Sequence, residues 1–463
     1  MNRRKFVKNA GVLAALGNID FIKTANAMDI DLKTIKVSDI GSNFEREKLI
    51  RPFGFKGGYL SELWQTVSRL ESNSGLSEIG IATQSVLYGD ADLFADNSEA
   101  NGNALMYVLV NKALKLVKET PFKTPVELLD NILPELVIEG KKVTGKDDLN
   151  LNFIYNALIS VDNAAWLLYA AENRFSNFDA MVPKAYKKAL SYKSDKIAIM
   201  YQIPYNMPMS ELLDAAKKGY FVFKIKTGFP GSQQEMLQGD IERLTQIHNT
   251  LKNVFTDQTP SGRIYYTMDA NARYEEKETL QKYLDHAKKI GAFDQILLYE
   301  EPFIETNNEN VSDLGIRIAA DESVHGESDA LRRLDQGYGS LVLKGIAKTL
   351  SFSMKIAKLA EERKVPCLCA DLTVNPILID WHKNLAGRIA PFPGINMGLM
   401  ETNGDMNYVN WNRMQAYHPY YGSSWMEVRN GVFELNKDFY DKSGGIFTPS
   451  KHYEELVNIK KDN

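Results

Sequence analysis

The most informative stretch of this chain is Phe221-Val-Phe-Lys-Ile-Lys226, an apolar, β-prone run that ends in charged side chains. Four later runs end in the same way, each in one acid or lysine: Tyr266-Thr-Met-Asp269, Leu298-Tyr-Glu300, Ile318-Ala-Ala-Asp321 and Leu341-Val-Leu-Lys344. Successive runs are separated by roughly one strand and one helix, the spacing of βα units. Residues at the carboxyl ends of barrel strands converge on one pocket, so we expect these side chains to lie together.

The spacing predicts an α/β fold, a modified TIM (β/α) barrel over residues 196–402. Residues 28–195 read as strands followed by helices, which indicates an α+β capping domain completed by a C-terminal tail, residues 403–463, that packs on it. The eight expected barrel strands are Ile197–Tyr201, Phe221–Lys226, Ile264–Met268, Ile296–Tyr299, Ile316–Ala320, Leu341–Leu343, Pro366–Ala370 and Arg388–Ala390. In the cap we expect a strand at Ile35–Ser42, a loop at Arg51–Tyr59, a strand pair at Leu76–Leu87 and helices from Ala104 to Arg174.

Composition narrows the partners of this 463-residue chain, which is 44% hydrophobic and 25% charged. The net charge of −4 and the lack of a basic run with interleaved aromatic residues argue against nucleic-acid binding. No uncharged apolar stretch reaches about eighteen residues, so we expect no membrane span. The sequence does not determine the oligomeric state, and a homo-oligomer is compatible with it.

Residues 1–27 resemble a twin-arginine export signal. Arg3 and Arg4 precede a short apolar run from Ala10 to Leu16, and Ala25-Asn-Ala27 is a small-x-small cleavage pattern. We therefore expect the twin-arginine export machinery to be a partner and the mature enzyme to work outside the cytoplasm, in the periplasm or beyond.

Asp269, Glu300 and Asp321 stand at consecutive predicted strand ends and supply the oxygen ligands that Mg²⁺ prefers, with Mn²⁺ as the alternative. Glu300 is chosen over Glu301 because alternate strand residues share a face. A metal bound there acts as a Lewis acid on a substrate carboxylate and stabilises the enediolate formed when the α-proton leaves.

Lys224 and Lys226 share one strand face, and a lysine beside a second cation loses its proton more readily. Lys344 stands four strands later, on the far side of an eight-stranded barrel. Two lysines on opposite faces of an enediolate can remove a proton from one face and return it to the other, which is a 1,1-proton transfer on a small-molecule carboxylate.

In order and spacing, Lys224-Ile-Lys226, Asp269-Ala-Asn271, Glu300-Glu-Pro302, Ala320-Asp-Glu-Ser323 and Leu343-Lys-Gly-Ile346 resemble the enolase superfamily, in its muconate-lactonizing-enzyme and dipeptide-epimerase-like branch. The resemblance implies that Asp269, Glu300 and Asp321 bind Mg²⁺. It also implies that Lys226 and Lys344 are the acid/base pair, with Lys224 assisting Lys226.

The chain also departs from that pattern. The Asp-x-Asp motif that holds a substrate ammonium in dipeptide epimerases is missing from the stretch 393–397. Asp371 could bind an ammonium instead, although a loop-capping role is about equally plausible. Asn271 is a further candidate for substrate binding, and Arg51 could pair with a distal substrate carboxylate unless it is an ordinary surface arginine.

The leading hypothesis is a racemase or epimerase acting α to a carboxylate, on an amino-acid derivative or dipeptide. The same residues also support cycloisomerisation or β-elimination. A non-catalytic binding protein on this fold would not need the intact acid/base and metal positions. A glycosidase needs two carboxylates free of metal, so three clustered acids beside lysines disfavour it.

The expected export route can be tested on the full chain. Replacing Arg3 and Arg4 by lysine should leave unprocessed protein in the cytoplasm, because the twin-arginine route reads that pair. Cell fractionation and N-terminal sequencing measure the outcome. Mature protein starting at Met28 in the envelope fraction of the double variant would refute the assignment.

Overall fold

The computed structural model describes residues 32–55 and 58–458. The described residues from Ile35 onward belong to one compact unit, and residues 32–34, which lie outside it, have no regular secondary structure. The expected export signal, residues 1–27, lies outside the described residues.

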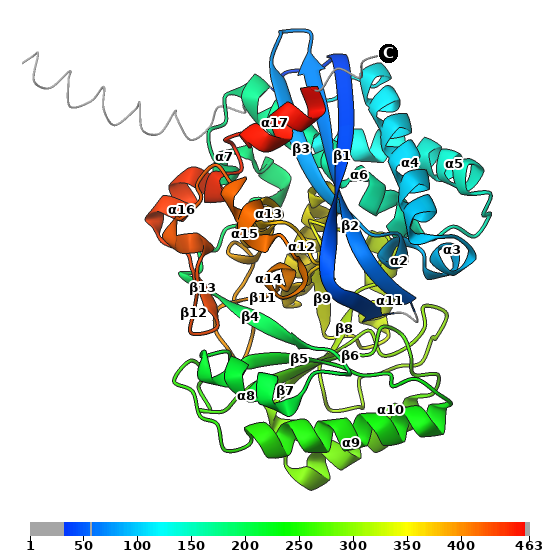
Figure 1. Ribbon diagram of the computed structural model, residues 1–463, viewed down its shortest axis with the longest axis vertical. Helices are drawn as coiled ribbons and strands as arrows, with labels where there is room; N and C mark the ends of the chain where they lie inside the picture. Colours follow the sequence, from blue (N-terminus) through cyan, green and yellow to red (C-terminus); the bar gives the residue numbers. More distant parts are fainter. Residues whose placement is uncertain (1–31, 56–57, 459–463) are drawn as a thin grey trace, which may run out of the picture. The chain divides into compact units, whose positions relative to one another are not determined.

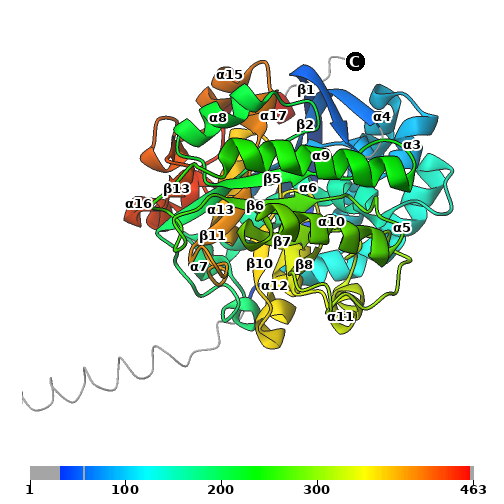
Figure 2. The same cartoon turned by 90° about the horizontal axis from the view of Figure 1, so that it is seen from below.

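Eight parallel strands close into a barrel, which confirms the predicted fold class (Figure 1). The strands are β4 (Lys196–Ile203), β5 (Val222–Lys226), β6 (Tyr265–Asp269), β7 (Ile296–Glu300), β8 (Ile318–Ala320), β9 (Ser340–Leu343), β10 (Cys367–Cys369) and β11 (Gly398–Glu401). Pairing of β11 with β4 completes the closure. The main helices between them are α8 (Met209–Lys217), α9 (Gln233–Leu251), α10 (Lys277–Ile290), α11 (Glu327–Asp335), α12 (Leu350–Arg363) and α13 (Pro376–Ala386), and Figure 2 shows α9 and α10 lying across the outside of the strands.

The eighth strand was predicted in the wrong place. Arg388–Ala390 is not a strand: it follows the end of α13, and the fully buried Arg388 donates to Asp179 at 2.5 Å. The strand that closes the barrel is β11, whose residues Gly398 to Glu401 pair in parallel with β4. Its four residues carry little local signal, and only this long-range pairing identifies it.

The cap is a three-stranded antiparallel sheet covered by helices. Its strands are β1 (Val37–Phe55), β2 (Gly58–Ser72) and β3 (Ser77–Gln84), followed by α2 (Val86–Gly89), α3 (Ala91–Asp96), α4 (Glu99–Glu119), α5 (Pro125–Thr144), α6 (Leu151–Asn173) and α7 (Phe178–Met181).

Two predictions for the cap were wrong. The segment Arg51–Tyr59 is not a free loop, because β1 and β2 remain paired as far as Phe55 and Gly58, and Leu76–Leu87 holds one strand and the start of α2 rather than two strands.

The cap is tied to the barrel through buried polar contacts. Asp162 on α6 accepts hydrogen bonds from the backbone N–H groups of Leu350 and Ser351 at the start of α12, at 3.0 and 3.1 Å. These are N–H groups that the first turn of a helix cannot satisfy internally. Burial raises the pKa of Asp162 to about 6, so this carboxylate is kept at the junction despite a desolvation cost.

The tail contacts both the cap and the barrel. Its elements are α14 (Gly404–Asn407), α15 (Trp411–Ala416), β12 (Val428–Arg429), β13 (Val432–Glu434), α16 (Lys437–Lys442) and α17 (Lys451–Asn458). Strand β13 pairs antiparallel with β4 of the barrel, whereas His452 on α17 lies 2.9 Å from Glu45 of β1. Tyr408 joins the two, since its hydroxyl donates to the Thr373 carbonyl and accepts from Gln65 of β2.

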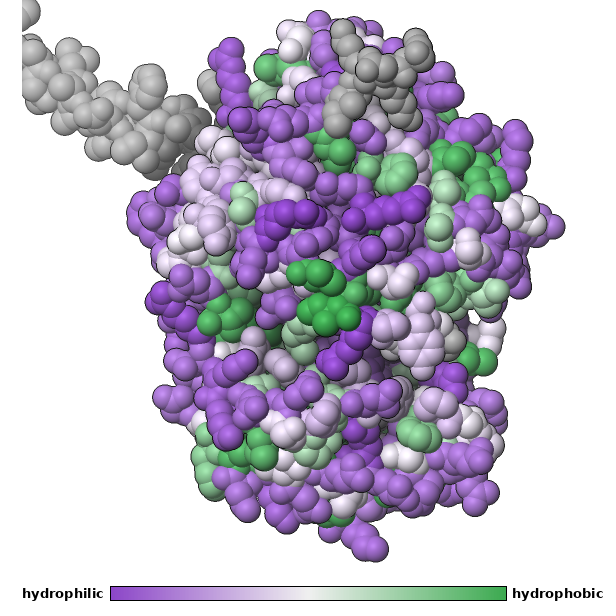
Figure 3. All heavy atoms as spheres, viewed as in Figure 1, coloured by the Kyte–Doolittle hydropathy of each residue, from purple (hydrophilic) through white to green (hydrophobic). Residues whose placement is uncertain are grey.

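Within the described residues, no helix is both long and apolar enough to cross a membrane. The face seen in Figure 3 is mainly hydrophilic, with hydrophobic residues in small separate patches.

The contact between α6 and β3 allows no side chain at Gly80. A Cβ there would lie 2.1 Å from the Ser160 carbonyl oxygen and 2.2 Å from the Ala164 nitrogen, both backbone atoms of α6. We predict that Gly80→Ala lowers the free energy of unfolding by roughly 1–3 kcal/mol or more, because α6 must move away. Chemical denaturation measures the change, with Gly326→Ala as control, since a Cβ there meets nothing nearer than 3.7 Å. Equal stability of the two variants would contradict the packing described.

Candidate active site

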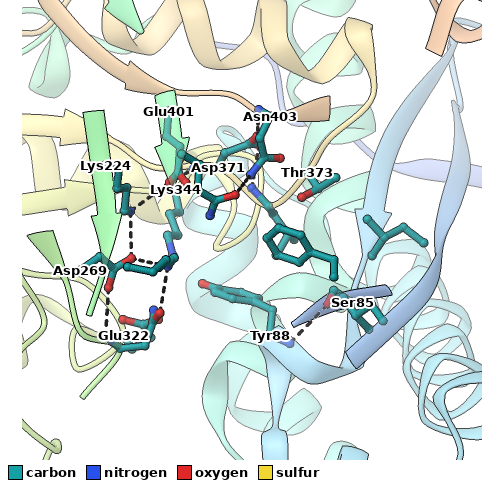
Figure 4. A pocket seen from close by; sticks show the side chains of 17 residues that line it. Ser85, Tyr88, Lys224, Asp269, Glu322, Lys344, Asp371, Thr373, Glu401 and Asn403 are labelled. Carbon is teal, nitrogen blue, oxygen red and sulfur yellow. Dashed lines mark hydrogen bonds and ion pairs between the residues drawn. The ribbon is translucent and has the colours of Figure 1, made fainter. Parts of the chain in front are cut away.

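Four of the six charged strand ends line one cavity between the barrel and the cap (Figure 4): Lys224, Lys226, Asp269 and Lys344. Glu300 and Asp321 lie behind them and are not among its lining residues. Parallel strands deliver these side chains to the same end of the barrel, as expected for a βα architecture. The cap side is formed by side chains of β1, β2 and α2, including Tyr88. The barrel side is formed by Gln202, Lys224, Lys226, Asp269, Asn271, Glu322, Lys344, Asp371, Leu372, Thr373, Glu401 and Asn403.

Lys224 lies at the centre of a buried ionic network. Its side chain is 2% exposed, and its Nζ atom lies 3.0 Å from Asp269, 2.9 Å from Glu300 and 3.0 Å from Glu401. Burial alone would lower the pKa of Lys224, but the three carboxylates outweigh it and hold that pKa well above its usual value. Lys224 is therefore a fixed positive charge in this arrangement and not a base.

Lys226 lies two residues after Lys224 on the same face of β5, and its side chain is more exposed. Its Nζ atom donates to Asp269 Oδ2 at 2.5 Å and to Asn271 Oδ1 at 2.8 Å. The amide nitrogen of Asn271 in turn donates to Glu322 at 2.9 Å. Lys226 is thus oriented by side chains of the β6 end and borders the cavity.

Lys344 reaches the cavity from β9 and forms an ion pair with Asp321. Its Nζ atom also lies 4.9 Å from the centre of the Tyr88 ring, which comes from the cap. Burial alone would lower the pKa of Lys344, but the Asp321 charge outweighs it and holds that pKa well above its ordinary value. The contact with Asp321 therefore favours the protonated form of Lys344.

The three predicted metal ligands are buried side by side, but lysines lie among them. Asp269 and Glu300 are register partners on β6 and β7, and Asp321 directly follows β8. Among the described residues, no three acids, histidines or cysteines form a ready-made metal cluster. Both Asp321 carboxylate oxygens and Glu300 Oε2 nevertheless accept no hydrogen bond from the described chain, only lysine ion pairs. An all-oxygen set with unsatisfied lone pairs suits Mg²⁺ in its chemistry.

The pKa values of the buried carboxylates Glu300 and Asp269 are shifted in opposite directions. Burial raises the pKa of Glu300 well above its ordinary value, and the Asp269 charge raises it further. Asp269 is also buried, but Lys224 and Lys226 outweigh the burial and lower its pKa. Glu301 has other partners than Lys224: it accepts the Asp321 N–H at 2.6 Å and lies 3.9 Å from Arg333. The choice of Glu300 over Glu301 from strand alternation therefore agrees with the side chain that faces Lys224.

Sequence reasoning missed Glu401, the last residue of β11, because it misplaced the eighth strand. Glu401 contacts Lys224 and accepts the Asp371 N–H at 3.2 Å. Asn403 follows it and donates to Gln202 of β4 at 2.9 Å. With β11 correctly located, a search for charged residues at strand ends would have found Glu401.

Two predicted substrate-binding residues have other partners. Asp371 accepts backbone N–H groups of Leu372, Asn403 and Val374 at 2.7, 2.8 and 3.4 Å, which is the loop-capping arrangement. Arg51 is not brought to the cavity: its side chain is 57% exposed and lies 3.8 Å from Glu211. Asn271, in contrast, lines the cavity beside Lys226.

Several solved structures share this fold at low sequence identity. A dipeptide epimerase from Enterococcus faecalis V583, complexed with Mg and L-Leu-L-Tyr, is 17% identical with a TM-score of 0.58, over 87% of this chain and 98% of that one. One from Cytophaga hutchinsonii, complexed with Mg and D-Ala-L-Val, is 17% identical with a TM-score of 0.56, over 81% and 88%. L-Talarate dehydratase from Polaromonas sp. JS666, complexed with Mg and L-glucarate, is 15% identical with a TM-score of 0.57, over 87% and 93%.

No curated protein matches the sequence. A family model does, over residues 209–397: the enolase C-terminal domain-like family. The matched segment runs from α8 to the residue before β11 and contains both lysine positions and all three predicted metal ligands. The matched part of the barrel is therefore similar to the enolase C-terminal domain-like family, in line with the resemblance seen in its motifs.

Proposed function

We propose that this protein is a Mg²⁺-dependent racemase or epimerase that moves the proton α to a carboxylate. One observation carries the proposal: Lys226 and Lys344 come from the second and sixth of eight barrel strands and border the same cavity. Strands four apart in a closed eight-stranded barrel lie on opposite sides, so a substrate between them presents one face to each lysine. The dipeptide epimerases and the dehydratase with this fold support carboxylate substrates.

The proton inventory of such a reaction balances with these two residues. The neutral amine of one lysine takes the α-proton, and the electron pair of the broken C–H bond moves toward the substrate carboxylate. The ammonium of the opposite lysine then gives its proton to the other face of the same carbon. After one turnover the two lysines have exchanged protonation states, and the reverse reaction starts from there.

Asp269, Glu300 and Asp321 are the residues that would hold Mg²⁺. An ion bound there would supply Lewis-acid stabilisation of the negative charge that builds up on the substrate carboxylate. Lys224 adds a buried positive charge beside Asp269 and Glu300, and Glu401 helps to hold its side chain in place. A fixed charge in a water-poor site needs no reorganisation during the reaction.

Cycloisomerisation and β-elimination remain the runner-up reactions, since they start from the same α-proton removal. They differ in needing only one lysine as a base. We also propose that the enzyme works outside the cytoplasm, on the strength of the twin-arginine-like residues 1–27 alone.

Removal of the metal should abolish activity. We predict that excess chelator stops α-proton exchange, and that Asp269→Asn, Glu300→Gln and Asp321→Asn each weaken Mg²⁺ binding in calorimetric titration, because each removes a ligand charge. Asp285→Asn, on the exposed face of α10, is the matched control and should bind as wild type does. Full activity in excess chelator would rule out the metal assignment.

The two lysines should serve opposite enantiomers. Lys344→Ala should stop racemisation yet leave exchange of solvent deuterium into the enantiomer served by Lys226, and Lys226→Ala should show the mirror image. Each loss should be on the order of 10²- to 10⁴-fold, the usual contribution of a positioned acid or base. Proton NMR in D₂O measures it, with Lys217→Ala on exposed α8 as control. Equal loss with both enantiomers in each variant, with metal still bound, would contradict the two-base reaction.

A further inference from the structure

The cavity has two unlike walls. The barrel wall carries the lysines and carboxylates described above. The described residues that the cap contributes are all uncharged, and three of them are large and apolar: Phe53, Leu60 and Leu63. Leu372, from the loop after β10, extends the apolar surface on the barrel side.

The apolar wall belongs to a packed core and is not a loose flap. Leu60 and Leu63 are 2% and 1% exposed and form a cluster with Tyr408 and Met414 of the tail, against which Phe53 also packs. The Tyr408 hydroxyl is hydrogen-bonded to Thr373, which itself lines the cavity. The position of this wall relative to the barrel is therefore set by buried contacts.

Several polar side chains on the barrel side of the cavity already have hydrogen-bond partners. Asp371 accepts three backbone N–H groups, and Asn403 and Gln202 are bonded to each other. Arg51, the cationic residue expected to meet a distal carboxylate, points to Glu211 instead. A charged group placed against Phe53, Leu60 and Leu63 would lose water and meet no opposite charge among the described cap residues of the cavity, which is costly, whereas an apolar group would gain.

We propose that the substrate is a carboxylate whose distal part is apolar, an aliphatic or aromatic group held by Phe53, Leu60 and Leu63, and neither acidic nor basic. This inference rests on the proposed function for its orientation, because it places the reacting carboxylate at the barrel wall. The distal group then faces the cap.

Four N-acyl alanines that differ only in the acyl group test it: hexanoyl, phenylpropanoyl, succinyl and aminohexanoyl. In α-proton exchange with Mg²⁺ present, kcat/KM for the hexanoyl and phenylpropanoyl compounds should exceed that for the succinyl and aminohexanoyl compounds by roughly 10- to 100-fold. Calorimetric binding of the same four compounds should give the same order. If no compound is exchanged, the proposed reaction fails, while the order of affinities still decides the subsite.

Two variants of Phe53 test whether this side chain causes the preference for an apolar acyl group. Phe53→Ala should cut the preference for phenylpropanoyl over succinyl by about 10-fold, whereas Phe53→Leu, which keeps an apolar side chain, should largely preserve it. Ile50→Ala, on the same strand but 59% exposed and away from the cavity, should leave the preference unchanged. Tighter binding of the succinyl or aminohexanoyl compound by the wild type would overturn the proposal, as would an unchanged preference in Phe53→Ala.

Discussion

The structure of the site depends on one buried cation, the ammonium of Lys224. It joins carboxylates from β6, β7 and β11 and so links strands around the barrel mouth. Removing one partner of a buried ion pair typically costs about 3–5 kcal/mol, because the remaining charge is left uncompensated. Keeping such a buried network costs stability whenever one partner is lost. Its presence beside two further lysines indicates that these residues serve the chemistry of the site and not the packing of the core.

The cap and the tail complete the site by covering that charged surface with an apolar one. Tyr408 bonds at once to β2 of the cap and to the loop after β10, so the far end of the chain sets the distance between the two walls. Asp162 secures a second cap–barrel junction at α12. The chemistry of the barrel wall and the selectivity of the cap wall thus come from separate parts of the chain that share one cavity.

Local sequence was sufficient where the signal was strong and repeated. Seven barrel strands followed from β-prone apolar runs, and the cap helices followed from apolar residues that recur at helical spacing. The cluster of Lys224, Asp269 and Glu300 followed from the charged residues at the strand ends. It failed where partners distant in sequence decide the outcome: β11 is four residues long, and its pairing with β4 cannot be seen locally, so Glu401 was missed with it. Asp371 does line the cavity, but its carboxylate accepts backbone N–H groups of the loop. Arg51 was wrongly expected at the cavity, because only the fold shows that its side chain lies beside Glu211.

Proton exchange by the wild-type protein tests the account most directly. With Mg²⁺ bound, each pure enantiomer of an N-acyl amino acid with an apolar acyl group should lose its α-proton to D₂O in the NMR spectrum, and the opposite enantiomer should appear with deuterium at that carbon. If Mg²⁺ and the compound both bind yet neither enantiomer exchanges its α-proton, the proposed two-lysine proton transfer is wrong.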